Sequence, residues 1–432
     1  MGKAKLSGRF CLALVIFSLI GQVAWVVENM YFNVFIYKMF HASASDISLM
    51  VAASAVSATV TTLLIGALSD KLGKRKLFIC GGYIIWGITI WSFALIRTDV
   101  IGTLLPGVAS AAAVGVSLVI IMDCVMTFFG SSANDACFNA WLTDMTDETN
   151  RGAAEGINAM MPLLAILVVF GGFMGFDLNL SESWVSIFTI IGIVVIAIGV
   201  LGIFLIQEPK VKTDENQNYF ANILYGFRPG VIAANKPLYA TLLAVAVFNI
   251  SIQIFMPYLI LYYNVTLQMA DYVLIMAPAI ILAAVFTFFY GRVYDRVGFR
   301  KAVIAPIVLL MAGYVLLYCC RSTLLVFVGS LLMMCGNLSG GAMFGAMVRD
   351  NTPANRAGMF QGLRICAQVL IPGVVGPAIG AAVLQNAATI INDDGTTSFI
   401  PNANIFLAAF QVGLAICVVL AWLFRMLKKE EK

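Results

Sequence analysis

Long apolar runs separated by short polar loops dominate the hydrophobic pattern of this chain. Each run is long enough to cross a bilayer core of roughly 30 Å as an α-helix. Lipid tolerates only helices or closed barrels, and no series of alternating ~10-residue segments appears, so we predict an all-α membrane protein. The pattern predicts twelve spans, at residues 10–38, 46–69, 76–97, 113–143, 153–176, 184–206, 238–263, 271–291, 301–320, 323–348, 357–385 and 403–426.

The composition agrees with this pattern. Of the 432 residues, 61% are hydrophobic and 11% are charged, and the mean hydropathy is +0.95, which excludes a soluble globule of this size. The nine cysteines stand singly apart from Cys319-Cys320, and the only histidine is His41, so no metal-ligand spacing exists. We therefore expect no metal site and no cofactor.

Basic residues are distributed unevenly between the two sides of the predicted spans. All but four of the 26 Lys and Arg residues fall on the side that holds both termini; the exceptions are Lys38, Arg97, Arg321 and Arg364. The positive-inside rule places both termini in the cytoplasm. The slight basic excess is therefore topological, and we expect no nucleic-acid partner.

One long polar stretch, residues 207–237, divides the chain into six-helix bundles at 1–206 and 238–432. Within this cytoplasmic linker, apolar residues at helical spacing over 219–227 predict a short interfacial helix. A further segment, 98–112, is apolar but interrupted by a Pro-Gly pair. We predict an outer loop or a re-entrant segment there.

Two pairs of motifs repeat between the halves. GALSDKLGKRK at 66–76 resembles GRVYDRVGFRK at 291–301, and DMTDETNRGAAEG at 144–156 resembles DNTPANRAGMFQG at 350–362. Six spans is an even number, so both copies run in the same direction, as in transporters built from parallel repeats. The matched positions are Asp70 with Asp295, Gly73 with Gly298, Arg75 with Arg300 and Asp144 with Asp350, and an arginine follows each of the last two, Arg151 and Arg356.

These motifs resemble the signature G-x-L-x-D-x-x-G-R-[KR] of the major facilitator superfamily. The loop GFRPGVIAANKPLYATLL at 226–243 is similar, more weakly, to that of glycoside–cation symporters. The resemblance implies two parallel six-helix bundles and transport by alternating access. One departure is that span 2 lacks the acidic residues with which melibiose-type carriers bind a cation.

The paired loops predict a cytoplasmic gate. The resemblance implies ion pairs of Arg75 with Asp144 and of Arg300 with Asp350, with Asp70 facing the start of span 11. The alternative is that these charges only fix the topology. The full predicted gate comprises Asp70, Gly73, Arg75, Asp144, Arg151, Asp295, Gly298, Arg300, Asp350 and Arg356.

Few ionisable residues lie inside the spans, where their cost makes function the default hypothesis. Asp135 is nine residues from the end of span 4, and Arg364 is eight residues beyond Arg356. At ~1.5 Å per residue both lie about 12–13 Å deep. We predict that Asp135, Arg364 and Glu28 serve cation coupling, the alternative being a permanent Asp135–Arg364 ion pair. The same residue counting places Asp123 at the solvated outer rim.

Amides and one indole form polar stripes on spans 1, 4, 7 and 11. Gln22, Asn29 and Asn33 fall on one face of a helical wheel, with Trp25 beside them. Amides both donate and accept hydrogen bonds, and an indole offers a flat apolar face, which suits a neutral polyhydroxylated ligand. The alternative is hydrogen bonding between packed helices. The predicted substrate-binding residues are Gln22, Trp25, Asn29, Asn33, Asn134, Asn249, Gln253, Gln361 and Gln368.

These features predict a monomeric secondary transporter in the plasma membrane, with the short loops favouring a bacterial inner membrane. Its partners are the lipid bilayer, a small-molecule substrate and a coupling proton or sodium ion. We expect cation-coupled, chiefly proton-coupled, uptake of a sugar or glycoside. Proton-driven efflux of amphiphilic drugs is the alternative, favoured by Glu28 and by PGVVGPAIG at 372–380. No nucleophile–base set or P-loop appears, so we expect no enzyme.

Overall fold

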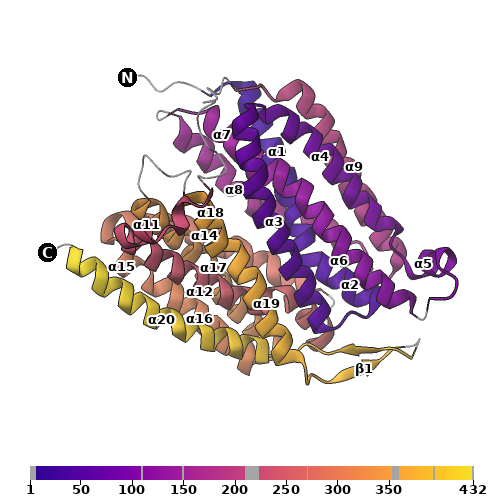
Figure 1. Cartoon of the computed structure of the whole chain (residues 1–432). Helices are drawn as coiled ribbons and strands as arrows, with labels where there is room; N and C mark the ends of the chain where they lie inside the picture. The colour runs from indigo at the N-terminus through magenta and orange to yellow at the C-terminus, as the bar shows by residue number, and fades with distance from the viewer. Residues whose placement is uncertain are drawn as a thin grey trace. The chain divides into compact units, whose positions relative to one another are not determined.

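The structure, a computed structural model, describes residues 6–108, 110–147, 150–209, 223–269, 271–352, 360–392 and 395–430 (Figure 1). Within these ranges twelve helices are long and apolar enough to cross a membrane, which confirms the predicted number. They are Gly8–Phe40, Ala44–Leu72, Arg75–Leu95, Ala111–Asp144, Arg151–Phe173, Ser181–Leu205, Lys236–Thr266, Tyr272–Tyr294, Phe299–Cys319, Thr323–Asn351, Gly362–Leu384 and Asn404–Leu427.

The individual elements subdivide several of these spans. In the first half they are α1 (Gly8–Val26), α2 (Asn33–Phe40), α3 (Ala44–Leu72), α4 (Arg75–Ser92), α5 (Thr98–Leu104), α6 (Ala111–Gly130), α7 (Asn139–Asp144), α8 (Arg151–Phe173) and α9 (Ser181–Leu205). In the second half they are α11 (Pro229–Ala234), α12 (Lys236–Phe255), α13 (Leu259–Leu261), α14 (Tyr272–Val297), α15 (Phe299–Ala302), α16 (Ile304–Cys319), α17 (Thr323–Asn351), α18 (Gln361–Ile365), α19 (Ile371–Leu384), β1 (Thr389–Ile391), β2 (Thr397–Phe399) and α20 (Asn404–Glu430).

The chain forms two compact units, residues 1–42 with 53–222 and residues 43–52 with 223–432. Equivalent helices pack together in each. In the N-terminal unit α1 packs on α8, and in the C-terminal unit α12 packs on α19, so spans 1 and 5 match spans 7 and 11. Likewise α4 contacts α6, and α16 contacts α17, which matches spans 3 and 4 with spans 9 and 10. The repeated packing agrees with the duplication seen in the motifs.

Four spans contain a π-helical segment, in which the backbone makes a wider turn than an α-helix. The segments are Val27–Phe32 in span 1, Ser131–Phe138 in span 4, Tyr262–Thr266 in span 7 and Cys366–Leu370 in span 11. These are the same four spans that bear the predicted polar stripes. Because π-helical turns occur frequently at functional sites, they direct attention to the side chains around them.

The repeated loops have the same backbone feature. Gly73 follows the end of α3 with a φ of 62°, and Gly298 follows the end of α14 with a φ of 71°. Each glycine donates its N–H to a helical carbonyl four residues earlier, that of Ser69 and that of Tyr294 respectively, both at 2.9 Å. Glycine adopts this left-handed region without the steric penalty that a Cβ imposes, which explains why it ends both helices.

Three loop segments add to the predicted picture. Residues 98–104 form the short, largely exposed helix α5, so this part of the predicted loop is helical. Between spans 11 and 12, β1 and β2 form an antiparallel hairpin that pairs Ile390 with Ser398 and that the sequence reading did not anticipate. The interfacial helix expected over 219–227 lies mostly outside the described residues, and its described end is a 3-10 turn, Tyr225–Phe227, followed by α11.

The closest helix packing in the N-terminal unit lies between α4 and α9, where two glycines meet. A Cβ on Gly87 would lie 2.7 Å from the carbonyl oxygen of Gly192, and one on Gly192 would lie 2.8 Å from the carbonyl oxygen of Gly87. Both contacts are with backbone, so the helices would have to separate. Small residues permit this approach, which drives packing between helices in lipid.

Replacing Gly87 with alanine is therefore expected to destabilise the protein, by ~1–3 kcal/mol from overpacking. Gly81 is the matched control on the same helix, because a Cβ there meets nothing within 4 Å. Gly81→Ala should leave stability unchanged or raise it by ~0.5–1 kcal/mol. Thermal unfolding of the two purified variants measures the difference, and equal midpoints would contradict this packing.

Candidate functional site

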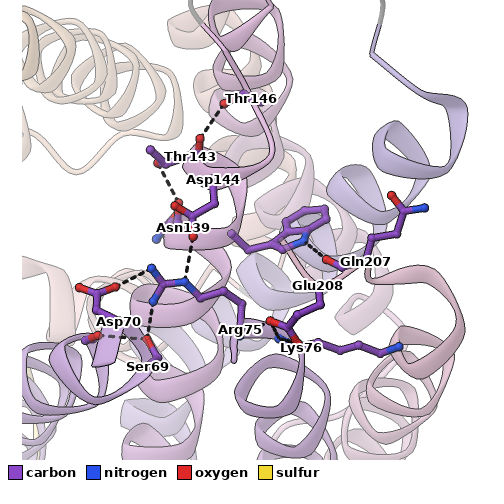
Figure 2. A network of polar contacts seen from close by, with 12 residues as sticks. Ser69, Asp70, Arg75, Lys76, Asn139, Thr143, Asp144, Thr146, Gln207 and Glu208 are labelled. Carbon is purple, nitrogen blue, oxygen red and sulfur yellow. Dashed lines mark hydrogen bonds and ion pairs between the residues drawn. The ribbon is translucent and has the colours of Figure 1, made fainter. Parts of the chain in front are cut away.

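The N-terminal copy of the repeated loop surrounds a buried cation, the guanidinium of Arg75 (Figure 2). The Arg75 side chain is 5% exposed and lies 2.5 Å from Asp70 and 2.9 Å from Asp144. Its Nη1 also donates a hydrogen bond of 2.6 Å to Ser69 Oγ. Asp70 and Ser69 come from the last turn of α3, and Asp144 ends α7. The turn at Gly73 brings the end of α3 back to Arg75 at the start of α4.

Glu208, which the sequence reading missed, joins the same network (Figure 2). Its carboxylate accepts hydrogen bonds from the backbone N–H groups of Arg75, at 2.5 Å, and Lys76, at 3.3 Å. An anion at this position satisfies unpaired N–H groups at the start of α4 and favours the helix dipole. Trp141 anchors the neighbouring residue by donating its indole N–H to the carbonyl of Gln207, at 2.9 Å. The signal in the sequence was an acidic residue directly after an apolar span.

Arg151 has a different role from the other predicted gate residues. Its guanidinium donates to the backbone carbonyls of Thr143 and Thr146, at 3.3 and 3.2 Å. These carbonyls lie at the end of α7, where a cation satisfies unpaired acceptors. Arg151 therefore fixes the turn that follows Asp144 and supports the gate network indirectly.

The C-terminal copy of the loop is described only in part. The hydroxyl of Tyr294 donates a hydrogen bond to the carboxylate of Asp350. Arg356 and the side chain of Asp295 lie outside the described residues. The ion pair of Arg300 with Asp350 stays a prediction.

A second cluster in the N-terminal unit contains two of the predicted substrate-binding residues. Trp25 donates its indole N–H to Asn134 Oδ1 at 3.3 Å, and Asn134 Nδ2 donates to the Tyr83 hydroxyl at 2.7 Å. The Tyr83 hydroxyl in turn donates to the backbone carbonyl of Phe17, at 2.7 Å. Gly21 makes room for this chain, because a Cβ there would lie 2.6 Å from the Tyr83 hydroxyl. Tyr83 was missed, since a tyrosine within an apolar span is usually a packing residue.

The other span 1 amides do not share one face, so the helical-wheel prediction is wrong for Asn33. Asn29 is exposed and donates to the carbonyl of Trp25, whereas Asn33 is 1% exposed and donates to the carbonyl of Asn29. The wheel assumed a constant α-helical period, but the π-helical segment Val27–Phe32 changes the phase between them. Gln22, before this segment, is partly exposed.

The acidic residues inside span 4 lie in different surroundings. Asp135 is partly exposed and accepts a hydrogen bond of 2.9 Å from Ser131 within the π-helical segment. Asp123 is 1% exposed, so its predicted place at a solvated rim is wrong. Counting residues at a constant rise from Asp144 assumed that the span is no longer than the bilayer. The span has 34 residues, so part of it extends beyond the apolar core and Asp123 lies inside.

The C-terminal unit has its own polar cluster at the π-helical segment of span 11. Arg364 is exposed and donates to Gln368 Oε1 at 3.3 Å, and Asn249 of α12 donates to the Gln368 carbonyl at 3.4 Å. Gln253, one turn from Asn249, packs against Gly376, where a Cβ would lie 2.5 Å from Gln253 Cβ. The side chain of Gln361 lies outside the described residues. The structure thus joins spans 7 and 11 through predicted residues.

Duplicated loops, twelve spans and repeated packing together define a recognisable architecture. Residues 9–286 and 241–432 both match the family model of the Major Facilitator Superfamily. The chain belongs to the major facilitator superfamily. The resemblance read from the loop motifs is therefore confirmed across the whole chain. No relative was found among curated proteins.

Solved structures of superfamily transporters share this fold at low sequence identity. A mutant form of the nucleoside transporter NupG has a TM-score of 0.71 at 14% identity, over 96% of this chain and 99% of that one. A bacterial homologue of the human lysosomal transporter Spinster has 0.69 at 15%, over 97% and 96%. The xylose transporter XylE from E. coli has 0.69 at 13%, over 96% and 97%. The fold is that of multi-pass membrane transporters, a class distinct from enzymes.

The Arg75 network predicts an order of stability effects. Asp70 is 45% exposed and Asp144 is 24% exposed, so Asp70→Asn should cost only ~0–1 kcal/mol and Asp144→Asn ~1.5–3 kcal/mol. Asp70→Asn should nevertheless slow uptake, because the gate pair is lost while the fold is kept. Thermal unfolding and initial uptake rates test both statements. A reversed order of stability, or wild-type uptake by Asp70→Asn, would contradict them.

Proposed function

We propose that this protein takes up a neutral, polyhydroxylated solute, a sugar or glycoside, by alternating access coupled to a proton. The observation that supports the substrate class is the chain of Trp25, Asn134 and Tyr83, which joins spans 1 and 4. It offers an indole face, an amide and a phenol next to the ionisable Asp135. Such groups bind hydroxyls by exchanging hydrogen bonds and stack on the apolar face of a sugar ring.

Two of the structural neighbours support the same class of solute. NupG is a nucleoside transporter and XylE is a xylose transporter, and both solutes present several hydroxyl groups. In the C-terminal unit, Asn249 and Gln368 supply further amides from spans 7 and 11. Amides without a fixed charge suit a neutral ligand, since each can donate and accept.

Asp135 is the proposed proton carrier. Its carboxyl lies in a π-helical segment within span 4, is partly exposed, and shares a hydrogen bond with Ser131. A carboxylate in a membrane span is costly unless it is neutralised or hydrated. An opening that changes hydration at Asp135 would therefore change its affinity for a proton. Binding of solute and proton would be linked in this way to alternating access.

The Arg75 network is the proposed cytoplasmic gate of the N-terminal unit. Asp70 and Asp144 contact one guanidinium from two different helices, and the pairs are only partly buried. Partly exposed pairs are weak enough to be broken and re-formed in each cycle.

The direct test uses the purified protein in lipid vesicles with a pH-sensitive dye outside. Addition of sugars, glycosides and nucleosides one at a time should produce external alkalinisation with the substrate and with no other compound. Alkalinisation requires that solute and proton enter together. Proton flux elicited only by amphiphilic cations, in the opposite direction to those cations, would overturn the proposal in favour of drug efflux.

Asp135→Asn should abolish accumulation of the solute while preserving exchange of labelled for unlabelled solute. Exchange needs no net proton movement, so it separates coupling from binding. Asp99→Asn, an exposed acidic residue on α5, is the matched control and should retain both activities. Undiminished accumulation by Asp135→Asn would show that another group carries the proton.

A further inference from the structure

Two acidic side chains are buried together in the N-terminal unit, apart from the residues assigned above. Glu28 lies in the π-helical segment of span 1 and is 7% exposed, and Asp123 lies in α6 and is 1% exposed. Carboxylates are almost never fully buried unless a cation or several donors compensate the charge. The pair therefore needs a physical explanation.

Hydroxyl groups from two further positions converge on these carboxyls. Ser54 of α3 donates to Glu28 Oε1 at 2.6 Å, and Thr127 of α6 donates to the same oxygen at 2.9 Å. Ser54 and Thr127 lie 2.9 Å apart, and Ser54 also interacts with Asp123. Asp123 is one helical turn before Thr127, on the same face of α6. Four side chains from three spans thus bring their oxygens to one place.

The remaining oxygens of this cluster have no donor. Neither Glu28 Oε2 nor Asp123 Oδ1 has a hydrogen-bond partner among the residues that the structure describes. Within the same residues, no Lys or Arg forms an ion pair with either carboxyl. The nearest further charge, Asp135, interacts with Glu28 and has the same sign. The cluster combines strong acceptors with a deficit of positive charge.

We propose that Glu28, Asp123, Ser54 and Thr127 form a binding site for a sodium ion. Hard cations prefer carboxylate and hydroxyl oxygens, and a hydroxyl can turn its lone pairs toward a cation. Four side-chain oxygens fall short of the six to eight that calcium takes, and magnesium dehydrates reluctantly. A single positive charge between the carboxyls offsets their repulsion. The site is separate from Asp135 and does not depend on which solute is carried.

The first experiment measures sodium binding without any solute. The purified full-length protein is unfolded thermally at one fixed pH, while sodium chloride replaces choline chloride at constant ionic strength. A ligand that binds only the folded state raises the midpoint in a saturable way. We expect a saturable rise with sodium and a smaller one with potassium. Equal midpoints in sodium and choline would overturn the proposal.

Substitutions at Thr127 provide a matched pair that keeps the net charge. Thr127→Val preserves the shape and removes the oxygen, and should raise the half-saturating sodium concentration by ~10-fold or more. Thr127→Ser retains the hydroxyl and should keep the half-saturating concentration near that of the wild type. Asp123→Asn should abolish the sodium effect, and Glu182→Gln, an exposed residue in the first turn of α9, should preserve it.

The outcomes separate this proposal from the proposed function. A sodium effect that survives in both Thr127→Val and Asp123→Asn places the ion elsewhere and overturns the assignment. A midpoint that depends on pH, but is the same in sodium and choline, means that a proton occupies the site and also overturns it. Neither result bears on proton-coupled uptake through Asp135, because no solute or transport is involved.

Discussion

The guanidinium of Arg75 is the interaction on which one end of the N-terminal unit depends. It is nearly completely buried and contacts the carboxylates of Asp70 and Asp144. The backbone of the same residue is bound by Glu208. The end of α3, the start of α4, the end of α7 and the stretch after α9 therefore meet at one residue. A buried cation must be paired, so these four segments cannot shift independently. The network favours discrete arrangements over gradual deformation.

The polar groups deeper in the N-terminal unit are satisfied in a different way. Trp25, Asn134 and Tyr83 form a chain of neutral hydrogen bonds, each of which another donor or acceptor can replace. Glu28 and Asp123 have hydroxyl neighbours but retain unpartnered oxygens. Charges at the loop are thus compensated by the protein itself, whereas the groups inside the spans retain capacity to bind something else. This contrast separates the structural polar groups from the exchangeable ones.

Much of this organisation could be predicted from the sequence, for identifiable reasons. Apolar run length fixes the spans, and the fixed order of Asp, Gly and Arg in the loops placed Arg75 with Asp144, which the structure shows in contact. Misplaced residues such as Asp123 and Asn33 share one cause, the assumption of a uniform helix. Span 4 is longer than a bilayer requires, and a π-helical segment interrupts the period of span 1.

Residues missed altogether had no local signal. Tyr83 is indistinguishable from a packing tyrosine until Asn134 is seen beside it. Glu208 looks like an ordinary loop acid until the N–H groups of α4 point at it. The hairpin of β1 and β2 is too short for its alternation to stand out. In each case the function of the side chain depends on a partner distant in the sequence.

The π-helical segments have a consequence for how this chain tolerates insertions and deletions. A π-helical turn closes its hydrogen bonds over one residue more than an α-helical turn. Removal of one residue from Ser131–Phe138 would let span 4 close into a regular α-helix with every backbone bond made. The same removal would rotate Asn139 and Asp144 relative to α6 by about 100°, the angle per residue of an α-helix. The length of these segments therefore fixes the relative orientation of the cytoplasmic and central halves of the span.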